Sequence, residues 1–204
     1  MFEDDADYAA FEKVLRQATD RSSMRLLAYC LMPNHWHLVL RPRRDGDLSR
    51  FVGWLTLTHT QRWHAHRHDA GTGHVYQGRY KSFMVDGDEH FLTVCRYVER
   101  NGLRAGLTRR AENWRWSSLW CLRQKKLNCD APIVDDWPVD RPRHWVRRVN
   151  QPEKREELEA LRRCVNRGRP YGREAWVKRM IRRLNLQATD RTRGRPRISG
   201  IKGS

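Results

Sequence analysis

The sequence predicts an α+β fold in which one antiparallel sheet carries helices on one face. Two short apolar segments, residues 24–32 and 35–41, have the character of strands. Only Pro33 and Asn34 separate them, which is typical of a hairpin. Several longer segments have apolar residues three or four positions apart, the spacing of amphipathic helices. Strands paired locally and mixed with such helices indicate α+β, and we find no internal repeat.

The helices are placed by this spacing and by their capping residues. The first is expected over residues 5–18, where Asp4 or Asp5 can cap the start. Gly102 is predicted to stop the helix that contains residue 97. A third strand is expected over residues 80–85. Further helices are expected over residues 47–66, 88–101, 153–165 and 173–184.

The charge is high and unevenly distributed. The 204 residues have a formal net charge of +17. Residues 141–204 hold 20 Lys and Arg against 6 Asp and Glu, a net of +14. A basic segment appended to a more neutral body is typical of a nucleic-acid-binding arm. The alternative is a basic protein whose charge has no specific partner.

The remaining composition indicates a cytoplasmic protein without a membrane partner. The five cysteines are odd in number and form no Cys-x-x-Cys pair, which fits reduced thiols. No segment approaches the ~20 apolar residues needed to span a bilayer. The acidic start of the chain lacks the apolar core of a signal peptide.

A first chemical pattern is the His35-Trp36-His37 triplet in the second predicted strand. Residues two apart in a strand point to the same face, so two imidazoles lie side by side there and can hold one divalent metal ion. Trp36, Leu38 and Leu40 form the opposite, apolar face. The alternative is a pair of surface histidines on an edge strand.

A second pattern is Tyr97 with Asn101, four residues apart on one face of a predicted helix. A tyrosine hydroxyl becomes a nucleophile when a metal polarises the phosphate that it attacks. The amide oxygen of Asn101 is a hard ligand that suits Mg²⁺ or Mn²⁺. The alternatives are a half-buried helix aromatic and a polar residue at a helix end.

Four segments together resemble the REP-associated tyrosine transposases, relatives of the small single-strand insertion-sequence transposases. Met-Pro-Asn-His-Trp-His-Leu-Val-Leu at 32–40 resembles the HUH motif of that family. Tyr-Val-Glu-Arg-Asn-Gly-Leu-Arg-Ala-Gly-Leu at 97–107 resembles its tyrosine-helix motif, with Gly102 where the family usually has Pro. Shorter matches lie at 77–82 and 114–118. The resemblance extends over about residues 4–120.

The resemblance implies a metal-dependent transposase and nuclease for single-stranded DNA. Such an enzyme cleaves and rejoins DNA at hairpin repeats through a 5′-phosphotyrosine intermediate. Tyr97 would be the nucleophile, and Mg²⁺ or Mn²⁺ would be bound by His35, His37 and Asn101. Relatives act as monomers or as homodimers, so both states remain open.

The resemblance also implies a ferredoxin-like antiparallel sheet, the HUH nuclease fold. Family members begin with a strand that lies beside the histidine strand, whereas this sequence begins at the following helix. We therefore expect the fold without its first strand, with an exposed sheet edge. Two other functions remain: a non-catalytic DNA-binding remnant that acts as a repressor, and a metal-dependent RNA-processing nuclease.

Basic residues near these motifs and in the C-terminal region are candidates for DNA binding. Two Arg-Gly-Arg-Pro segments, at 167–170 and 193–196, resemble the minor-groove AT-hook. The alternative for the first copy is an ordinary basic linker. The predicted DNA-binding residues are Arg79, Lys81, Arg96, Arg104, Arg167, Arg169, Arg193, Arg195 and Arg197.

These patterns divide the chain into four regions. Residues 1–128 are expected to form the HUH transposase catalytic domain, and residues 129–152, which are rich in Pro, a linker. Residues 153–188 would form a basic helical DNA-binding extension. Residues 189–204 have little apolar content and are predicted to be a disordered basic tail.

Overall fold

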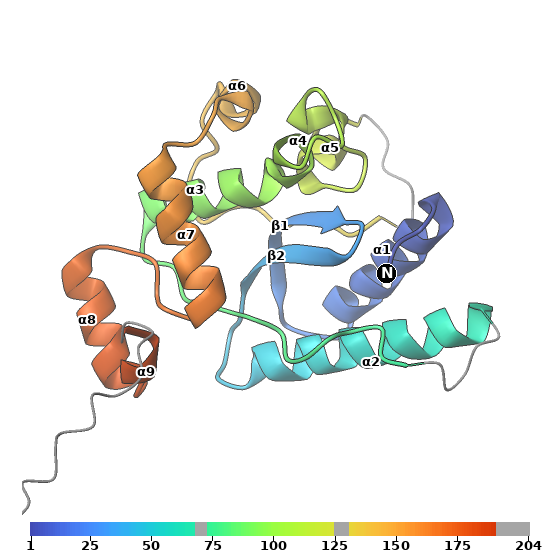
Figure 1. The fold of residues 1–204 in the computed structure, drawn as a ribbon, viewed down its shortest axis with the longest axis horizontal. Coiled ribbons are helices and arrows are strands. Elements are labelled where there is room, and N and C mark those ends of the chain that lie inside the picture. The colour runs from blue at the N-terminus through green and yellow to red at the C-terminus, as the bar shows by residue number, and fades with distance from the viewer. Residues whose placement is uncertain (68–72, 125–130, 191–204) are drawn as a thin grey trace, which may run out of the picture.

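The computed structural model describes residues 1–67, 73–124 and 131–190, and it confirms the α+β class with an antiparallel hairpin. The hairpin lies at the centre, with helices around it (Figure 1). The elements are α1 Asp5–Asp20, β1 Arg25–Met32, β2 His35–Arg41, α2 Asp47–Arg67, α3 Asp88–Glu99, α4 Asn101–Arg104, the 3-10 helix η1 Ala111–Asn113, α5 Ser118–Arg123, α6 Trp145–Asn150, α7 Arg155–Arg167, α8 Glu174–Arg183 and α9 Gln187–Asp190.

The hairpin separates two hydrophobic cores. On one face Tyr29 and Leu31 of β1 pack with α1 and α2. On the other face Cys30 of β1 packs with α3, α6 and α7. Helices therefore cover both faces of the hairpin, whereas the sequence predicted them on one face only, and this is why β1 is almost entirely buried. Its near-continuous apolar sequence follows from this two-sided burial.

The outer edge of β1 is occupied by chain that follows α4. The Leu31 amide donates to the Trp116 carbonyl at 2.8 Å. The indole N–H of Trp137 donates to the Leu27 carbonyl at 2.7 Å. Isolated hydrogen bonds from single residues thus take the place of a third strand at this edge. Among the described residues, the two-stranded sheet is the only sheet.

The early elements lie where the sequence predicts them. Helix α1 begins at Asp5, and the Asp4 side chain caps it by accepting from the Asp7 amide at 3.0 Å. The alternation in β2 holds: Trp36 joins the core with α1 and α2, and His35 and His37 lie on the opposite face.

The predicted strand at 80–85 is wrong. Val85 alone forms a bridge, parallel to Tyr171, and no other residue of this segment belongs to a strand or bridge in the described part of the chain. The backbone hydrogen bonds at this point run from Tyr171 to Met84 and from Asp86 to Tyr171. Without a continuous partner, an apolar segment does not form a strand, whatever its propensity.

The prediction that Gly102 stops the helix containing Tyr97 is also wrong. That helix, α3, ends at Glu99, and after Arg100 the chain continues into α4, so Gly102 lies inside a helix. We call α3 and α4 together the tyrosine helix. Gly102 is buried, and a Cβ there would lie 2.5 Å from Cγ of Trp114. The glycine is therefore required for close packing against this indole. Gly106, with φ +73°, lies beyond the helix end and provides the left-handed turn.

The C-terminal half contributes to the second core. Trp145 and Val149 of α6, within the segment proposed as a linker, are fully enclosed with Leu161 of α7. Helix α7 ends at Arg167, and its C-cap residue Gly168 adopts the left-handed conformation with φ +69°. Residues 191–204, most of the predicted tail, lie outside the described residues.

Candidate active site

A cleft of about 1470 Å³ opens beside the hairpin. Its walls are β2, α2, the segment 75–82, the tyrosine helix and α7. The predicted nucleophile and all three predicted metal ligands line it: His35, His37, Tyr97 and Asn101. Elements that lie far apart in the sequence therefore converge on one concave surface.

The two histidines face each other. Their Nε2 atoms are 3.0 Å apart. Nitrogen ligands about 2.1 Å from one ion and at right angles to each other have about this separation. Nδ1 of His35 lies 2.6 Å from the Asn34 amide oxygen. Because that oxygen only accepts, Nδ1 carries the proton and Nε2 keeps its lone pair for a metal. The pair therefore fits a divalent ion.

The surroundings keep both imidazoles neutral. Burial lowers the pKa of His37 to about 3, with further contributions from His35 and from the Arg104 cation. Burial and the Arg104 cation also lower the pKa of His35. A metal ligand must be deprotonated, so the site favours the state that binds metal.

Tyr97 and Asn101 share one wall of the cleft. The Tyr97 ring meets the His37 ring edge to face, with their centroids 5.9 Å apart. The Asn101 amide nitrogen donates to the Tyr97 carbonyl at 2.9 Å, which fixes the orientation of its side chain. The Asn101 oxygen, the proposed metal ligand, accepts a hydrogen bond from Arg104. An amide oxygen has two lone pairs, so one remains for a metal.

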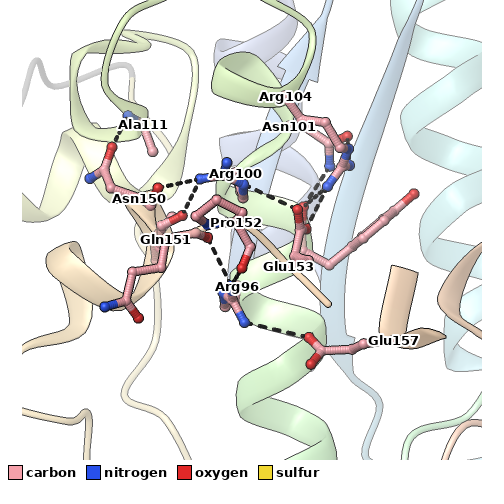
Figure 2. A network of polar contacts seen from close by, with 12 residues as sticks. Arg96, Arg100, Asn101, Arg104, Ala111, Asn150, Gln151, Pro152, Glu153 and Glu157 are labelled. Atoms are coloured by element: carbon pink, nitrogen blue, oxygen red, sulfur yellow. Dashed lines mark hydrogen bonds and ion pairs between the residues drawn. The ribbon is translucent and has the colours of Figure 1, made fainter. Parts of the chain in front are cut away.

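The predicted DNA-binding residues of the catalytic unit occupy different environments. Arg79 and Lys81 are exposed on the cleft, and Lys81 donates to Asn166 of α7 at 3.3 Å. Arg104 also lines the cleft, with its guanidinium over the Tyr97 ring. Arg96 does not line it. It is buried against the C-terminal segment, where it donates to the Gln151 and Pro152 carbonyls (Figure 2).

The first Arg-Gly-Arg-Pro segment forms the end of α7 and the turn that follows. Arg167 is the last residue of the helix, and Gly168 is its left-handed cap. Arg169 pairs with Asp190 at 2.8 Å and with Glu174 at 3.6 Å. The predicted DNA-binding residues of the second copy lie outside the described residues: Arg193, Arg195 and Arg197.

The sequence did not place several of the cleft residues beside the predicted catalytic residues. Arg162 and Asn166 reach the cleft from α7, and Tyr80 stands 41% exposed with its hydroxyl 3.1 Å from Ser49 of α2. One signal was present for the packing of α7. Arg96 and Arg104 lie two helical turns apart on one face of the tyrosine helix, complementary to the acidic residues near 153–157.

Two features are absent from the part of the chain that the structure describes. No three or more of its His, Cys, Asp or Glu side chains cluster as a metal site, and the proposed ligand set of two His and one Asn has a different composition. None of the described helices is long and apolar enough to cross a membrane.

One comparison with known proteins gives a match. A family model described as IS200-like transposase matches residues 1–101, which include the hairpin, the histidine pair, Tyr97 and Asn101. Neither the curated proteins nor the solved structures contain a significant match. By this family match, the chain belongs to the IS200-like transposases.

Proposed function

We propose that the protein is a metal-dependent tyrosine nuclease that cuts and rejoins single-stranded DNA at hairpin repeats. The observation that carries the proposal is the convergence of the histidine pair, Tyr97 and Asn101 on one basic cleft. His35, His37 and Asn101 would hold Mg²⁺ or Mn²⁺, which when bound supplies Lewis-acid polarisation of the scissile phosphate.

The protein residues perform the remaining chemistry. The Tyr97 oxygen attacks phosphorus as its proton leaves to solvent, and the bond from phosphorus to the 3′-oxygen breaks. The products are a 5′-phosphotyrosine and a 3′-hydroxyl, with the leaving oxygen taking up a proton. Attack by a 3′-hydroxyl on this linkage reverses the step and rejoins the strand. The covalent bond conserves the energy, so no cofactor hydrolysis is required.

The cleft wall has the chemistry that binds a single strand. Arg79, Lys81 and Arg162 supply cations for phosphates. The exposed ring of Tyr80 lies between the first two in the sequence and presents a face on which a base can stack. Cations interleaved with an exposed aromatic favour single-stranded over double-stranded DNA, because bases in a duplex are already stacked.

The test is the covalent adduct. A labelled hairpin oligonucleotide incubated with Mg²⁺ or Mn²⁺ should become attached to the protein, as seen by denaturing electrophoresis. Tyr97→Phe should abolish the adduct because it removes the nucleophilic oxygen. Tyr80→Phe is the matched control: it removes a hydroxyl from the same cleft and should leave the adduct intact.

Other outcomes would identify other functions. An adduct that persists in Tyr97→Phe would contradict the assignment of the nucleophile. Tight binding without any adduct would instead favour a DNA-binding repressor. Cleavage of RNA without an adduct and without a need for Tyr97 would favour an RNA-processing nuclease.

A further inference from the structure

The sequence marks Arg104 as a candidate DNA contact, but its surroundings indicate a different role. We propose that Arg104 is a positioning residue for Tyr97 and Asn101, and that Glu153 holds it in place. The C-terminal segment would thereby complete the active site. This inference rests on the proposed function, in which Tyr97 is the nucleophile and Asn101 a metal ligand.

The first observation is that Arg104 contacts both active-site residues of its helix. Its guanidinium carbon lies 4.1 Å from the centroid of the Tyr97 ring. Nη2 donates to the Asn101 amide oxygen, and Nη1 lies 3.4 Å from the Tyr97 carbonyl. One planar group therefore covers a face of the nucleophile and orients the amide oxygen proposed to bind metal. A lysine ammonium lacks the planar fork needed for both contacts.

The second observation is that the carboxylate of Glu153 forms an ion pair with the same guanidinium group of Arg104. Its carboxylate accepts from Arg104 Nη1 at 2.7 Å and from Arg100 Nε at 3.1 Å. The Glu153 side chain is only 4% exposed, so these ion pairs are shielded from solvent. A DNA phosphate would have to compete with a carboxylate that is already in place.

The third observation is the wider network around Glu153 (Figure 2). Arg100 Nη1 donates to the Val149 and Asn150 carbonyls at 2.9 and 2.7 Å. Arg96, one turn earlier, donates to two further carbonyls of the same segment. Three arginines on one face of the tyrosine helix thus fix the chain just before α7. This geometry places Glu153 beside Arg104 rather than in solvent.

Four variants separate positioning from phosphate binding. Arg104→Gln removes the charge and the fork, Arg104→Lys keeps the charge alone, and Glu153→Gln removes the anion that holds Arg104. The matched control is Glu157→Gln, on α7 one turn beyond, whose carboxylate pairs with Arg96 at 3.6 Å. Each variant is first compared with the wild type by thermal melting. Adduct rate and the salt dependence of single-strand binding are then measured.

Positioning predicts a loss of rate without a loss of electrostatic binding. Arg104→Lys and Glu153→Gln should each lower the rate of adduct formation about 100-fold, the cost of a misplacement near 1 Å. Glu157→Gln should retain the wild-type rate. In Arg104→Gln the salt slope, which is the slope of the logarithm of the binding constant against the logarithm of the salt concentration, should stay unchanged. Glu153 already neutralises the charge of Arg104 in the wild type.

Three results would overturn the inference. A salt slope reduced by about 0.7 in Arg104→Gln would show a phosphate contact. Tighter DNA binding in Glu153→Gln would show that the carboxylate competes with phosphate for Arg104. A wild-type adduct rate in folded Arg104→Lys would show that charge alone suffices. If the wild type forms no adduct, the proposed function fails, and the salt slopes still decide the role of Arg104.

Discussion

At the residue scale, the site depends on small side chains placed by close packing as much as on the reactive groups. Gly102, beside Asn101, allows the tyrosine helix to pass against Trp114. The indole cannot move away easily, since its N–H donates to the Leu31 carbonyl of β1 at 2.9 Å. The helix and the hairpin are therefore held in register near the active site.

Gly102→Ala should destabilise the protein by about 1–3 kcal/mol, the usual cost of overpacking. The control is Gly53→Ala in α2, where a Cβ would meet nothing within 4 Å. Because alanine restricts the unfolded chain more than glycine, this variant should be more stable by about 0.5–1 kcal/mol. Urea denaturation measures both. Equal effects at the two positions would contradict the packing role of Gly102.

The sequence predicted the histidine pair because strand alternation is a local property. Tyr97 and Asn101 were likewise indicated by a helical spacing and by the family motif. The environment of Arg104 was only partly predictable. The sequence shows acidic residues near 153–157 that are complementary to Arg104, but it does not show which of them pairs with it, because Glu153 is 49 residues away.

At the element scale, α1 and β1 are joined by a buried polar contact. Tyr29 in β1 donates its hydroxyl proton to Glu12 of α1 at 2.7 Å. Burial is the main cause that raises the pKa of Glu12, from 4.5 to about 6. The folded state therefore keeps the proton of this carboxyl to a higher pH than the unfolded state does.

The consequence is a stability contribution that is present below about pH 4.5 and lost as pH rises through about 6. The two pKa values differ by an amount equivalent to about 2 kcal/mol. The free energy of unfolding of the wild type, relative to Glu12→Gln, should fall by this amount from about pH 4 to about pH 7. Urea titrations at both pH values test this. A pH-independent difference would contradict it.

The elements that the sequence located best are those with a complete local signal. Helix α1 has a capping aspartate and a regular apolar face, and β2 has strict alternation. Segment 80–85 has strand-like composition but only one bridging residue, because β1 and β2 pair with each other and Trp116, Asp135 and Trp137 occupy the outer edge of β1. A strand needs a neighbouring strand to pair with, so a prediction of a strand at residues 80–85 from composition alone was wrong.

At the scale of the whole molecule, residues 141–204 combine a basic charge suited to DNA with side chains that complete a hydrophobic core. The sequence showed only the charge. The net charge of +14 in this region indicates DNA binding, yet Trp145, Val149 and Leu161 complete the second core. We propose that the residues up to α7 are structural as well as basic. The region beyond 190 would then act mainly through its charge.

Two truncations test this division. Ending the chain after residue 190 removes five cations, Arg191, Arg193, Arg195, Arg197 and Lys202, and none of the residues of the two cores. The melting temperature should stay unchanged, while the salt slope of single-strand binding should fall by about 0.7 for each phosphate that these cations neutralise in the full chain. An unchanged slope would mean that these cations do not contact DNA.

Ending the chain after residue 152 also removes Leu161 and Glu153. It should lower the melting temperature, because it exposes the second core and leaves Arg100 and Arg104 without their buried carboxylate.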